Sequence, residues 1–187
     1  MDPRTDVILT GIGGQGIQLC AKVLANAAVA DGLHVMLSSY FGGEMRGGRT
    51  EATVIVRENP IVDLPPIVPR LDALIVLHSE FLADAVPRLT ADPLVVADAW
   101  AWPDDAGSDA VRVPAREIAA DLGVPVAAGL ALVGAFAQLT GVATPAALET
   151  AVRDLVPPHR AAALEANLAA LTAGAESVRG TPVGITR

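Results

Sequence analysis

Cysteine, histidine and lysine are scarce in this chain, and their scarcity excludes several classes of function. Cys20 is the only cysteine among 187 residues, so the chain forms no internal disulfide and cannot ligate an iron–sulfur cluster with its own cysteines. The three histidines lie far apart and share no ligand spacing, so the sequence predicts no metal site. We expect Cys20 to be a small buried hydrophobe within a helix.

Aromatic residues and basic residues are also few. Phe, Trp and Tyr make up 3% of the chain, so the core must consist mainly of Ala, Val, Leu and Ile. The formal net charge of −8 argues against nucleic-acid binding, because neutralising phosphates requires concentrated Lys and Arg. No run reaches the ~18 apolar residues of a membrane span, and the N-terminus lacks the order of a signal peptide. We therefore expect a cytoplasmic protein that binds neither nucleic acid nor membrane.

Apolar residues, in contrast, are abundant. The chain is 52% hydrophobic and 18% charged, which favours one domain with a sizeable core. Its mean hydropathy of +0.46 is high for a soluble monomer. Partner subunits that cover surplus apolar surface would explain this value, although an alanine-rich composition alone would also produce it.

Strands and helices alternate along the first two thirds of the chain. Short apolar or β-branched runs predict strands, and 3.6-residue periodicity predicts helices. The predicted strands are 6–10, 33–39, 51–57, 71–77, 94–97 and 110–113. The predicted helices are 15–31, 80–89, 115–122, 127–139, 145–155 and 160–173. This pattern predicts an α/β, Rossmann-like fold: a mostly parallel sheet with helices on both faces, an inserted antiparallel strand at 51–57 and a helical C-terminal third.

A glycine turn (residues 11–16) joins the first predicted strand to the first predicted helix. Gly11, Gly13 and Gly16 fit G-x-G-x-x-G, in which missing side chains allow a tight turn, close approach of a ligand and close packing of helix on strand. A dinucleotide site also requires an Asp or Glu at the end of the second strand. Here that strand ends in serines, and Asp31, which has the nominal spacing, precedes it. We therefore favour a structural role, or contact with another partner, over independent NAD binding.

A second glycine segment (residues 38–49) follows the second predicted strand and contains four glycines, two arginines and one acid. In a doubly wound fold, both segments emerge at the carboxyl edge of the sheet, where the parallel strands end and ligands bind. Arg46 and Arg49 can hold a phosphate or carboxylate by forked hydrogen bonds. The alternative is an ordinary surface loop in which Arg46 pairs with Glu44.

Together, the two segments resemble the gamma subunit or gamma domain of 2-oxoacid:ferredoxin (acceptor) oxidoreductases, which include pyruvate, 2-oxoglutarate and 2-oxoisovalerate enzymes. In that family, G-x-G-G-Q-G opens the domain, and a segment of the type Ser-Tyr-Gly-Pro-Glu-x-Arg-Gly-Gly follows the second strand. Here residues 11–16 read GIGGQG and residues 39–48 read SYFGGEMRGG. Phe-Gly-Gly thus replaces Gly-Pro and adds one residue. The resemblance extends over about residues 5–176.

The resemblance implies an organisation and a chemistry. It implies a single gamma-type domain at 1–176, followed by an irregular tail at 177–187. Complexes of this family decarboxylate a 2-oxoacid on thiamine diphosphate, pass electrons through iron–sulfur clusters to ferredoxin or another acceptor, and transfer the acyl group to coenzyme A. Thiamine diphosphate, Mg²⁺ and the clusters are expected in alpha and beta subunits, and in a ferredoxin-like delta subunit where one is present. This chain alone is expected to bind no cofactor and to be inactive in isolation.

The resemblance also implies a site. The chain would pack on the alpha and beta subunits, stabilise the assembly and shape the entrance for substrate and coenzyme A. Arg46 is the first choice for contacting a substrate carboxylate, a coenzyme A phosphate or a partner's acid, and Gln15 can supply a side-chain amide. No residue of this chain is expected to be catalytic. The residues expected to contact substrate, coenzyme A or a partner are Gly11, Gly13, Gly14, Gln15, Gly16, Ser39, Tyr40, Glu44, Arg46, Gly47, Gly48 and Arg49.

Two alternatives stay open. A free-standing Rossmann-type NAD(P)-binding oxidoreductase fits the glycine turn but lacks the ribose acid and a Tyr-x-x-x-Lys pair, since Tyr40 is the only tyrosine and Lys22 the only lysine. A non-catalytic scaffold module is the other alternative. In a scaffold, the glycines would serve close packing and Gln15 would cap the start of the helix.

Overall fold

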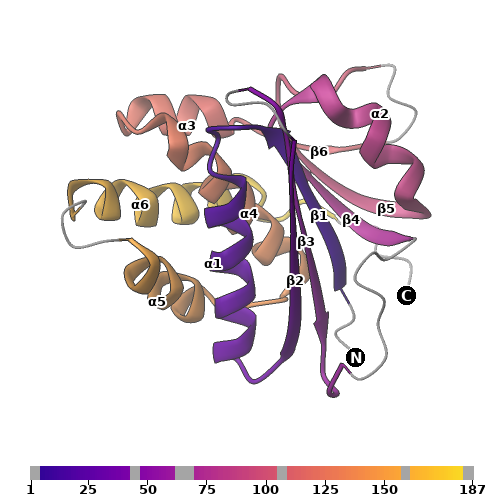
Figure 1. Cartoon of the computed structure of the whole chain (residues 1–187). Coiled ribbons are helices and arrows are strands. Elements are labelled where there is room, and N and C mark those ends of the chain that lie inside the picture. The colour runs from indigo at the N-terminus through magenta and orange to yellow at the C-terminus, as the bar shows by residue number, and fades with distance from the viewer. Residues whose placement is uncertain (1–4, 43–46, 62–69, 105–108, 157–160, 183–187) are drawn as a thin grey trace.

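The computed structural model of the chain describes residues 5–42, 47–61, 70–104, 109–156 and 161–182. Within these ranges, six strands form one sheet in the order β2-β3-β1-β4-β5-β6 (Figure 1). The strands are β1 (Thr5–Ile12), β2 (His34–Phe41), β3 (Arg49–Arg57), β4 (Leu71–Val76), β5 (Leu89–Asp98) and β6 (Val111–Val113). Strand β3 is antiparallel to both of its neighbours, whereas β1, β4, β5 and β6 run parallel. The predicted α/β fold with an inserted antiparallel strand is confirmed.

Strand β3 lies between β1 and β2 and determines where the second glycine segment is placed. It pairs with β1 from Thr5↔Val56 to Ile12↔Arg49, and on its other side with β2. Strand β2 is therefore an edge strand that pairs with β3 and not with β1. The second glycine segment connects β2 to β3. Its last residue, Arg49, therefore lies beside Ile12, the last residue of β1.

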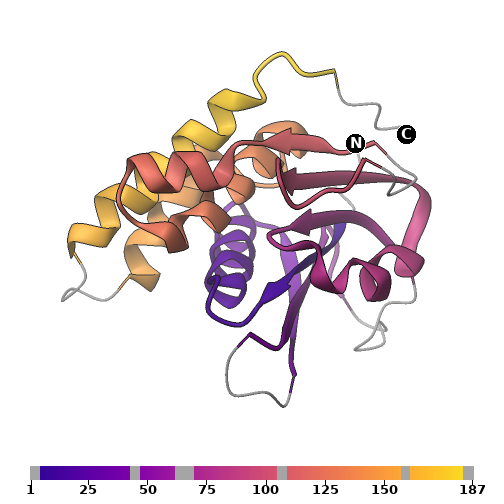
Figure 2. The same cartoon turned by 90° about the horizontal axis from the view of Figure 1, so that it is seen from above.

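The helices cover the two faces of the sheet unequally. One face carries α1 (Ile17–Ala30), α3 (Ala115–Asp121), α4 (Ala128–Thr140), α5 (Pro145–Leu155) and α6 (Ala161–Ser177), and the other carries α2 (Leu82–Ala85) (Figures 1 and 2). Successive residues of a strand point to opposite faces. In β1, Val7 and Leu9 accordingly pack in the core under the larger helical layer, whereas Ile8 packs in the core under α2.

The helix predicted at 80–89 is much shorter than expected. Four residues form α2, and one 3₁₀ turn lies on each side of it, at Ser79–Phe81 and Val86–Arg88. Pro87 lies in the second of these turns. A proline cannot donate the backbone hydrogen bond that would continue an α-helix. The helix therefore gives way to a 3₁₀ turn before β5 begins.

The predicted start and end signals of the C-terminal helices are confirmed. Gly141 ends α4 in the left-handed conformation with φ 68°, as a glycine after a helix commonly does. The Oγ of Thr144 accepts a hydrogen bond from the Ala147 amide at 3.3 Å, and Pro145 is the first residue of α5. Asp31, directly after α1, accepts hydrogen bonds from the Thr144 amide at 2.6 Å and from its hydroxyl at 2.9 Å. Asp31 therefore joins the end of α1 to the start of α5.

Helices α4 and α6 pack with almost no space between their backbones. A Cβ on Gly134 would overlap the carbonyl oxygen of Leu171, and a Cβ on Gly174 would overlap that of Ala131. The last residue of α6 is Ser177, one residue inside the region expected to be an irregular tail, and Val178 is buried after it. Among the helices of the described ranges, none is both long and apolar enough to cross a membrane.

Candidate functional site

The glycine turn links β1 to α1 at the carboxyl edge, and two of its four glycines, Gly11 and Gly16, have close neighbours where a Cβ would lie. A Cβ on Gly11 would lie 2.6 Å from Gln15 Oε1 and 3.2 Å from Leu77 Cβ. Gly16 has φ 80°, and a Cβ there would lie 2.9 Å from Val126 Cγ1. Gly14 also has a positive φ, of 100°, with no atom near its missing Cβ. These glycines let the turn lie against β4 and the start of α4.

The side chain of Gln15 points back into the protein. Its Oε1 accepts a hydrogen bond from the Ile12 amide at 2.9 Å, and its Nε2 donates to the Leu77 carbonyl at 3.2 Å. The amide therefore joins the end of β1 to the residue after β4. Both polar atoms of Gln15 are thus engaged within the chain.

The structure brings the glycine turn and the second glycine segment together, as the sequence predicted. The Gly13 amide donates to the Gly48 carbonyl at 2.9 Å, and the Gly42 amide donates to the Arg49 carbonyl at 2.7 Å. The first bond connects the two segments, and the second closes the base of the second segment. The expected contacts Glu44 and Arg46 lie outside the described residues.

The side chains next to this base point to both faces of the sheet. Ser39 and Tyr40 belong to β2, and Arg49 belongs to β3. The Ser39 hydroxyl donates to Gln18 Oε1 at 2.5 Å on the face covered by α1. On the other face, the Arg49 guanidinium carbon lies 5.1 Å from the centre of the Tyr40 ring, which is 53% exposed. An arginine over an aromatic face is a favourable cation–π arrangement.

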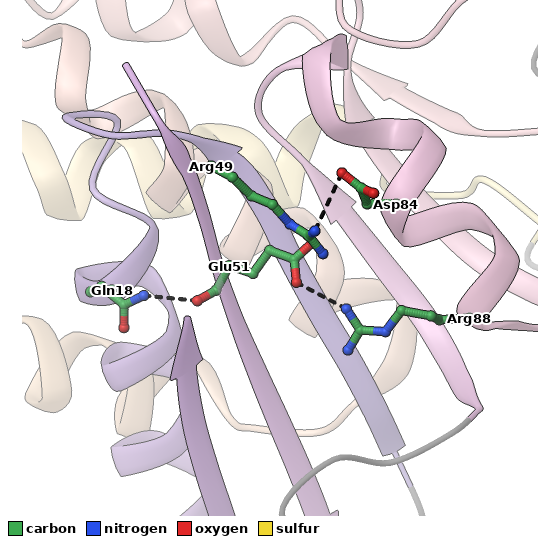
Figure 3. A network of polar contacts seen from close by, with 5 residues as sticks. All are labelled: Gln18, Arg49, Glu51, Asp84 and Arg88. Carbon is green, nitrogen blue, oxygen red and sulfur yellow. Dashed lines mark hydrogen bonds and ion pairs between the residues drawn. The ribbon is translucent and has the colours of Figure 1, made fainter. Parts of the chain in front are cut away.

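Glu51 holds the guanidinium of Arg49 from within the sheet (Figure 3). Its Oε1 accepts from Arg49 Nη2 at 2.6 Å and from Nε at 2.9 Å, and its Oε2 accepts from Arg88 Nη1 at 2.9 Å. Arg49 Nη1 also lies 3.3 Å from Asp84 Oδ2. Sequence reasoning nominated Arg49 but missed Glu51, which lies two residues along the same strand and therefore on the same face. It also missed Asp84 and Arg88, because no local motif pairs residues on separate elements.

A cavity of about 350 Å³ opens at the same carboxyl edge. It lies where β4 and β5 end and where α3 and α4 begin, and polar and apolar side chains share its wall. Its lining residues are Gly14, Gln15, Leu77, Asp98, Arg116, Ala120, Pro125, Val126, Ala128 and Leu132. Ligands of open α/β sheets bind in such crevices outside the carboxyl ends of the strands.

Asp98, Trp100 and Arg116 form a polar cluster beside this cavity. Asp98 Oδ2 accepts a hydrogen bond from Trp100 Nε1 at 2.7 Å and lies 3.6 Å from Arg116 Nε. The Arg116 guanidinium carbon lies 3.5 Å from the Trp100 ring centre, and the His78 ring meets the same indole edge-on at 4.9 Å. The sequence contained one usable signal that was missed: Asp98 ends a buried parallel strand, the position where α/β folds place functional residues.

Burial raises the pKa of the Asp98 carboxyl above its ordinary value of 3.8. The Trp100 hydrogen bond and the Arg116 charge oppose that rise. Cys20 shows a stronger effect, because burial raises the pKa of its thiol to about 12. A thiol with this pKa stays protonated near neutral pH and is a poor nucleophile and metal ligand.

The chemistry that the carboxyl edge supports is binding. Arg116 offers a cation that is 55% exposed in its side chain, and Val126, 45% exposed, offers an apolar surface beside it. In the part of the chain that the structure describes, no three His, Cys, Asp or Glu side chains are grouped as metal ligands. This edge therefore suits a ligand or a partner surface that has an anionic group and an apolar group.

Comparisons with known proteins identify relatives over nearly the whole chain. The family described as pyruvate ferredoxin/flavodoxin oxidoreductase matches residues 6–177. The 2-oxoglutarate synthase subunit KorC of Methanothermobacter thermautotrophicus is 31% identical over 188 residues, which cover 95% of this chain and 97% of the relative.

Solved structures share the fold. The keto/oxoacid ferredoxin oxidoreductase gamma subunit from Geobacter sulfurreducens matches with a TM-score of 0.76 and 26% identity, covering 94% of this chain and 97% of that one. The 2-oxoglutarate:ferredoxin oxidoreductase from Magnetococcus marinus, solved with 2-oxoglutarate, coenzyme A and succinyl-CoA, matches with a TM-score of 0.83 and 18% identity. That match covers 96% of this chain but 32% of the larger chain.

Proposed function

The chain belongs to the pyruvate ferredoxin/flavodoxin oxidoreductase family, and we propose that it is a gamma-type subunit whose carboxyl edge forms part of the entrance for 2-oxoacid and coenzyme A. The KorC relative is a subunit of 2-oxoglutarate synthase, and the Geobacter relative is a gamma subunit of a keto/oxoacid ferredoxin oxidoreductase. The match to this chain covers 97% of each. The complex would oxidatively decarboxylate a 2-oxoacid to an acyl-coenzyme A in the cytoplasm. Ferredoxin or another acceptor would take the electrons.

The cofactors of this reaction would reside in other subunits. The described residues include no cluster of potential metal ligands, and the only thiol of the chain is buried and protonated. This donor set does not fit an iron–sulfur cluster or the Mg²⁺ that anchors a diphosphate. Thiamine diphosphate, Mg²⁺ and the clusters would therefore belong to alpha, beta and delta-type partners.

The observation that carries the proposal is the meeting of three features at one edge. The Gly13–Gly48 hydrogen bond joins the two glycine segments, and the cavity with Arg116 opens beside Gly14 and Gln15. An arginine beside a cavity with polar and apolar walls suits a molecule that has phosphate groups and a partly apolar arm, as coenzyme A has. Arg46 stays our first candidate in the second glycine segment for an anion contact.

Purification of the tagged chain from its native cytoplasm tests the subunit assignment. We expect thiamine- and iron–sulfur-containing partners to co-purify, together with coenzyme A-dependent oxidation of one member of a 2-oxoacid panel. A lone chain that binds NAD(P) tightly would overturn the assignment.

An Arg116→Ala variant of the assembled complex tests the entrance. Removing a charge-assisted contact should raise the KM for coenzyme A or for the 2-oxoacid about tenfold. Arg153→Ala is the control, because Arg153 is half-exposed on α5 and its ion pair with Glu165 is long, at 3.9 Å. Equal KM values for the two variants would contradict a role of Arg116 in the entrance.

A scaffold role is the second candidate, and the packing of the glycine turn favours it. Gly11 and Gly16 are explained by close contacts within the chain, and both polar ends of Gln15 are engaged internally. A scaffold predicts that Arg46→Ala and Arg116→Ala lower the yield of complex while turnover and KM per assembled complex stay unchanged. The free-standing NAD(P) alternative is less favoured, because Asp31, its nominal ribose acid, is bound to Thr144.

A further inference from the structure

Glu51 is a buried carboxylate in the middle of a network of four charged side chains. It is 4% exposed, and its two oxygens accept three hydrogen bonds from two arginines. Figure 3 shows Arg49 and Arg88 approaching it from different elements, β3 itself and the turn after α2. Each oxygen of Glu51 has its own arginine, so the carboxylate fixes the distance between the two elements.

The guanidinium of Arg49 contacts three side chains. Besides the two bonds to Glu51, its guanidinium lies 3.3 Å from Asp84 on α2 and stacks on Tyr40 of β2. The Glu51 carbonyl also accepts from Gln18 Nε2 at 2.9 Å, so α1 is bonded to the same residue from the opposite face of the sheet. Helices on both faces are thereby tied to one residue of β3.

The main effect of such a network is geometric. Taking charges out of water opposes their mutual attraction, so a buried ion pair adds little net stability compared with a well-packed apolar pair. A planar guanidinium bound by two of its nitrogens to one carboxylate, however, has its orientation fixed. Glu51 therefore fixes the orientation of the Arg49 side chain at the start of β3.

The backbone at Arg49 forms the base of the second glycine segment. Its carbonyl accepts from the Gly42 amide at 2.7 Å, and the preceding carbonyl, that of Gly48, accepts from the Gly13 amide at 2.9 Å. A shift of Arg49 would thus move both the base of the segment and its bond to the glycine turn. These two segments form the edge that we assign to the coenzyme A entrance.

We propose that Glu51 is a positioning residue that acts through Arg49: it holds residues 47–49, at the end of the second glycine segment, against the glycine turn and thereby determines the affinity of the assembled oxidoreductase for coenzyme A. This inference rests on the proposed function of that edge. Glu51 itself is buried, and both of its carboxylate oxygens are taken up by arginines of the same chain. Its effect should therefore fall on KM rather than on kcat.

Glu51→Gln in the assembled complex tests the proposal. The neutral amide keeps the shape but loses the charge and an acceptor for the two arginines. We expect the KM for coenzyme A to rise about tenfold while kcat stays within about twofold. The same strand pair supplies a matched control, Asp6→Asn, because Asp6 is 1% exposed and is bonded by Arg57 at 2.5 and 3.0 Å at the opposite end of β1 and β3.

A double-mutant cycle tests whether Glu51 acts through Arg49. Arg49→Lys keeps the charge but loses the two guanidinium bonds to Glu51, so it should raise the KM for coenzyme A by a similar factor. If the Glu51→Gln subunit fails to assemble, the KM of the Arg49→Lys complex still tests the proposal. The two effects should not add in the double variant. Additive effects, or a KM after Glu51→Gln equal to that after Asp6→Asn, would overturn the proposal. A wild-type complex without coenzyme A-dependent activity would instead refute the proposed function.

Discussion

The side-chain amide of Gln15 donates a hydrogen bond to the carbonyl of Leu77, 62 residues away in the chain, at 3.2 Å. Its oxygen accepts from the Ile12 amide in the same turn. This side chain thus adds to the backbone bond from the Leu77 amide to the Thr10 carbonyl, at 3.0 Å, in joining the end of β1 to the residue after β4. Both strands end beside the cavity, so this bond helps define the cavity wall.

Replacing Gln15 with alanine should destabilise the fold. The change removes both hydrogen bonds and leaves the Ile12 amide and the Leu77 carbonyl without this partner, so we expect a loss of about 1–3 kcal/mol in the free energy of unfolding. Urea denaturation measures this loss. The control is Gln138→Ala, an exposed glutamine on α4, which should change stability by less than about 0.5 kcal/mol. Equal losses for the two variants would contradict the role of Gln15.

Alanine at Gly134 should be among the most damaging single methyl additions in this protein. The new Cβ would overlap the Leu171 backbone carbonyl, which cannot move without separating α4 from α6. We expect a loss of more than about 2 kcal/mol, measured by urea or thermal unfolding.

Gly129→Ala provides the matched comparison for Gly134→Ala on the same helix. There the Cβ would lie 2.5 Å from Cys20 Sγ, a side-chain atom. Cys20→Ala should therefore recover part of the stability lost in Gly129→Ala, but none of that lost in Gly134→Ala. Equal recovery at both sites would show that the clash with Cys20 is not the cause.

The stability of the protein should depend on pH through Asp98. Because burial raises the pKa of Asp98 above 3.8, the folded state holds this proton to higher pH than the unfolded state does. The stabilising contribution is then complete below 3.8 and is lost as pH rises through the pKa in the folded protein. Relative to Asp98→Asn, the wild type should thus become less stable as pH rises through that window.

Urea unfolding of wild type and Asp98→Asn over a pH series measures this dependence. Asparagine can still accept the Trp100 hydrogen bond, so the difference between the two proteins reports chiefly on the charge. Asp121→Asn at the exposed end of α3 controls for removing one negative charge. A stability difference that stays constant with pH, or that moves in favour of the wild type, would contradict the prediction.

The local elements could be read from the sequence because their signals are local. Pro145 at the start of α5 and Gly141 at the end of α4 stand where proline and glycine signals place them. The alternation at 51–57 likewise predicted a strand, but β3 is buried on both faces from Glu51 to Val56 rather than half-buried, because it lies between β1 and β2 and is covered on both sides. The helix expected at 80–89 was too long, because Pro87 was not weighed as a break in the α-helical hydrogen bonds.

Parts of the candidate site could also be read, through glycine patterns that need no partner to be recognised. The meeting of the glycine turn with the second segment followed from the rule that parallel strands end at one edge. Arg116 was missed, because its significance depends on a cavity formed by β5, α3 and α4 together. Asp98 was missed although its place at the end of a buried parallel strand was a usable signal. Glu51 was missed because it was read only as the first residue of a strand.

The sequence alone determined the class of fold, the places of most helices and strands, and the two glycine segments, since propensity, periodicity and turn chemistry act over a few residues. Only the tertiary structure decided which distant groups meet. It placed Arg88 on Glu51 across 37 residues and Thr144 on Asp31 across 113. Such pairs depend on the order of strands in the sheet and on which face each helix covers, which no local pattern specifies.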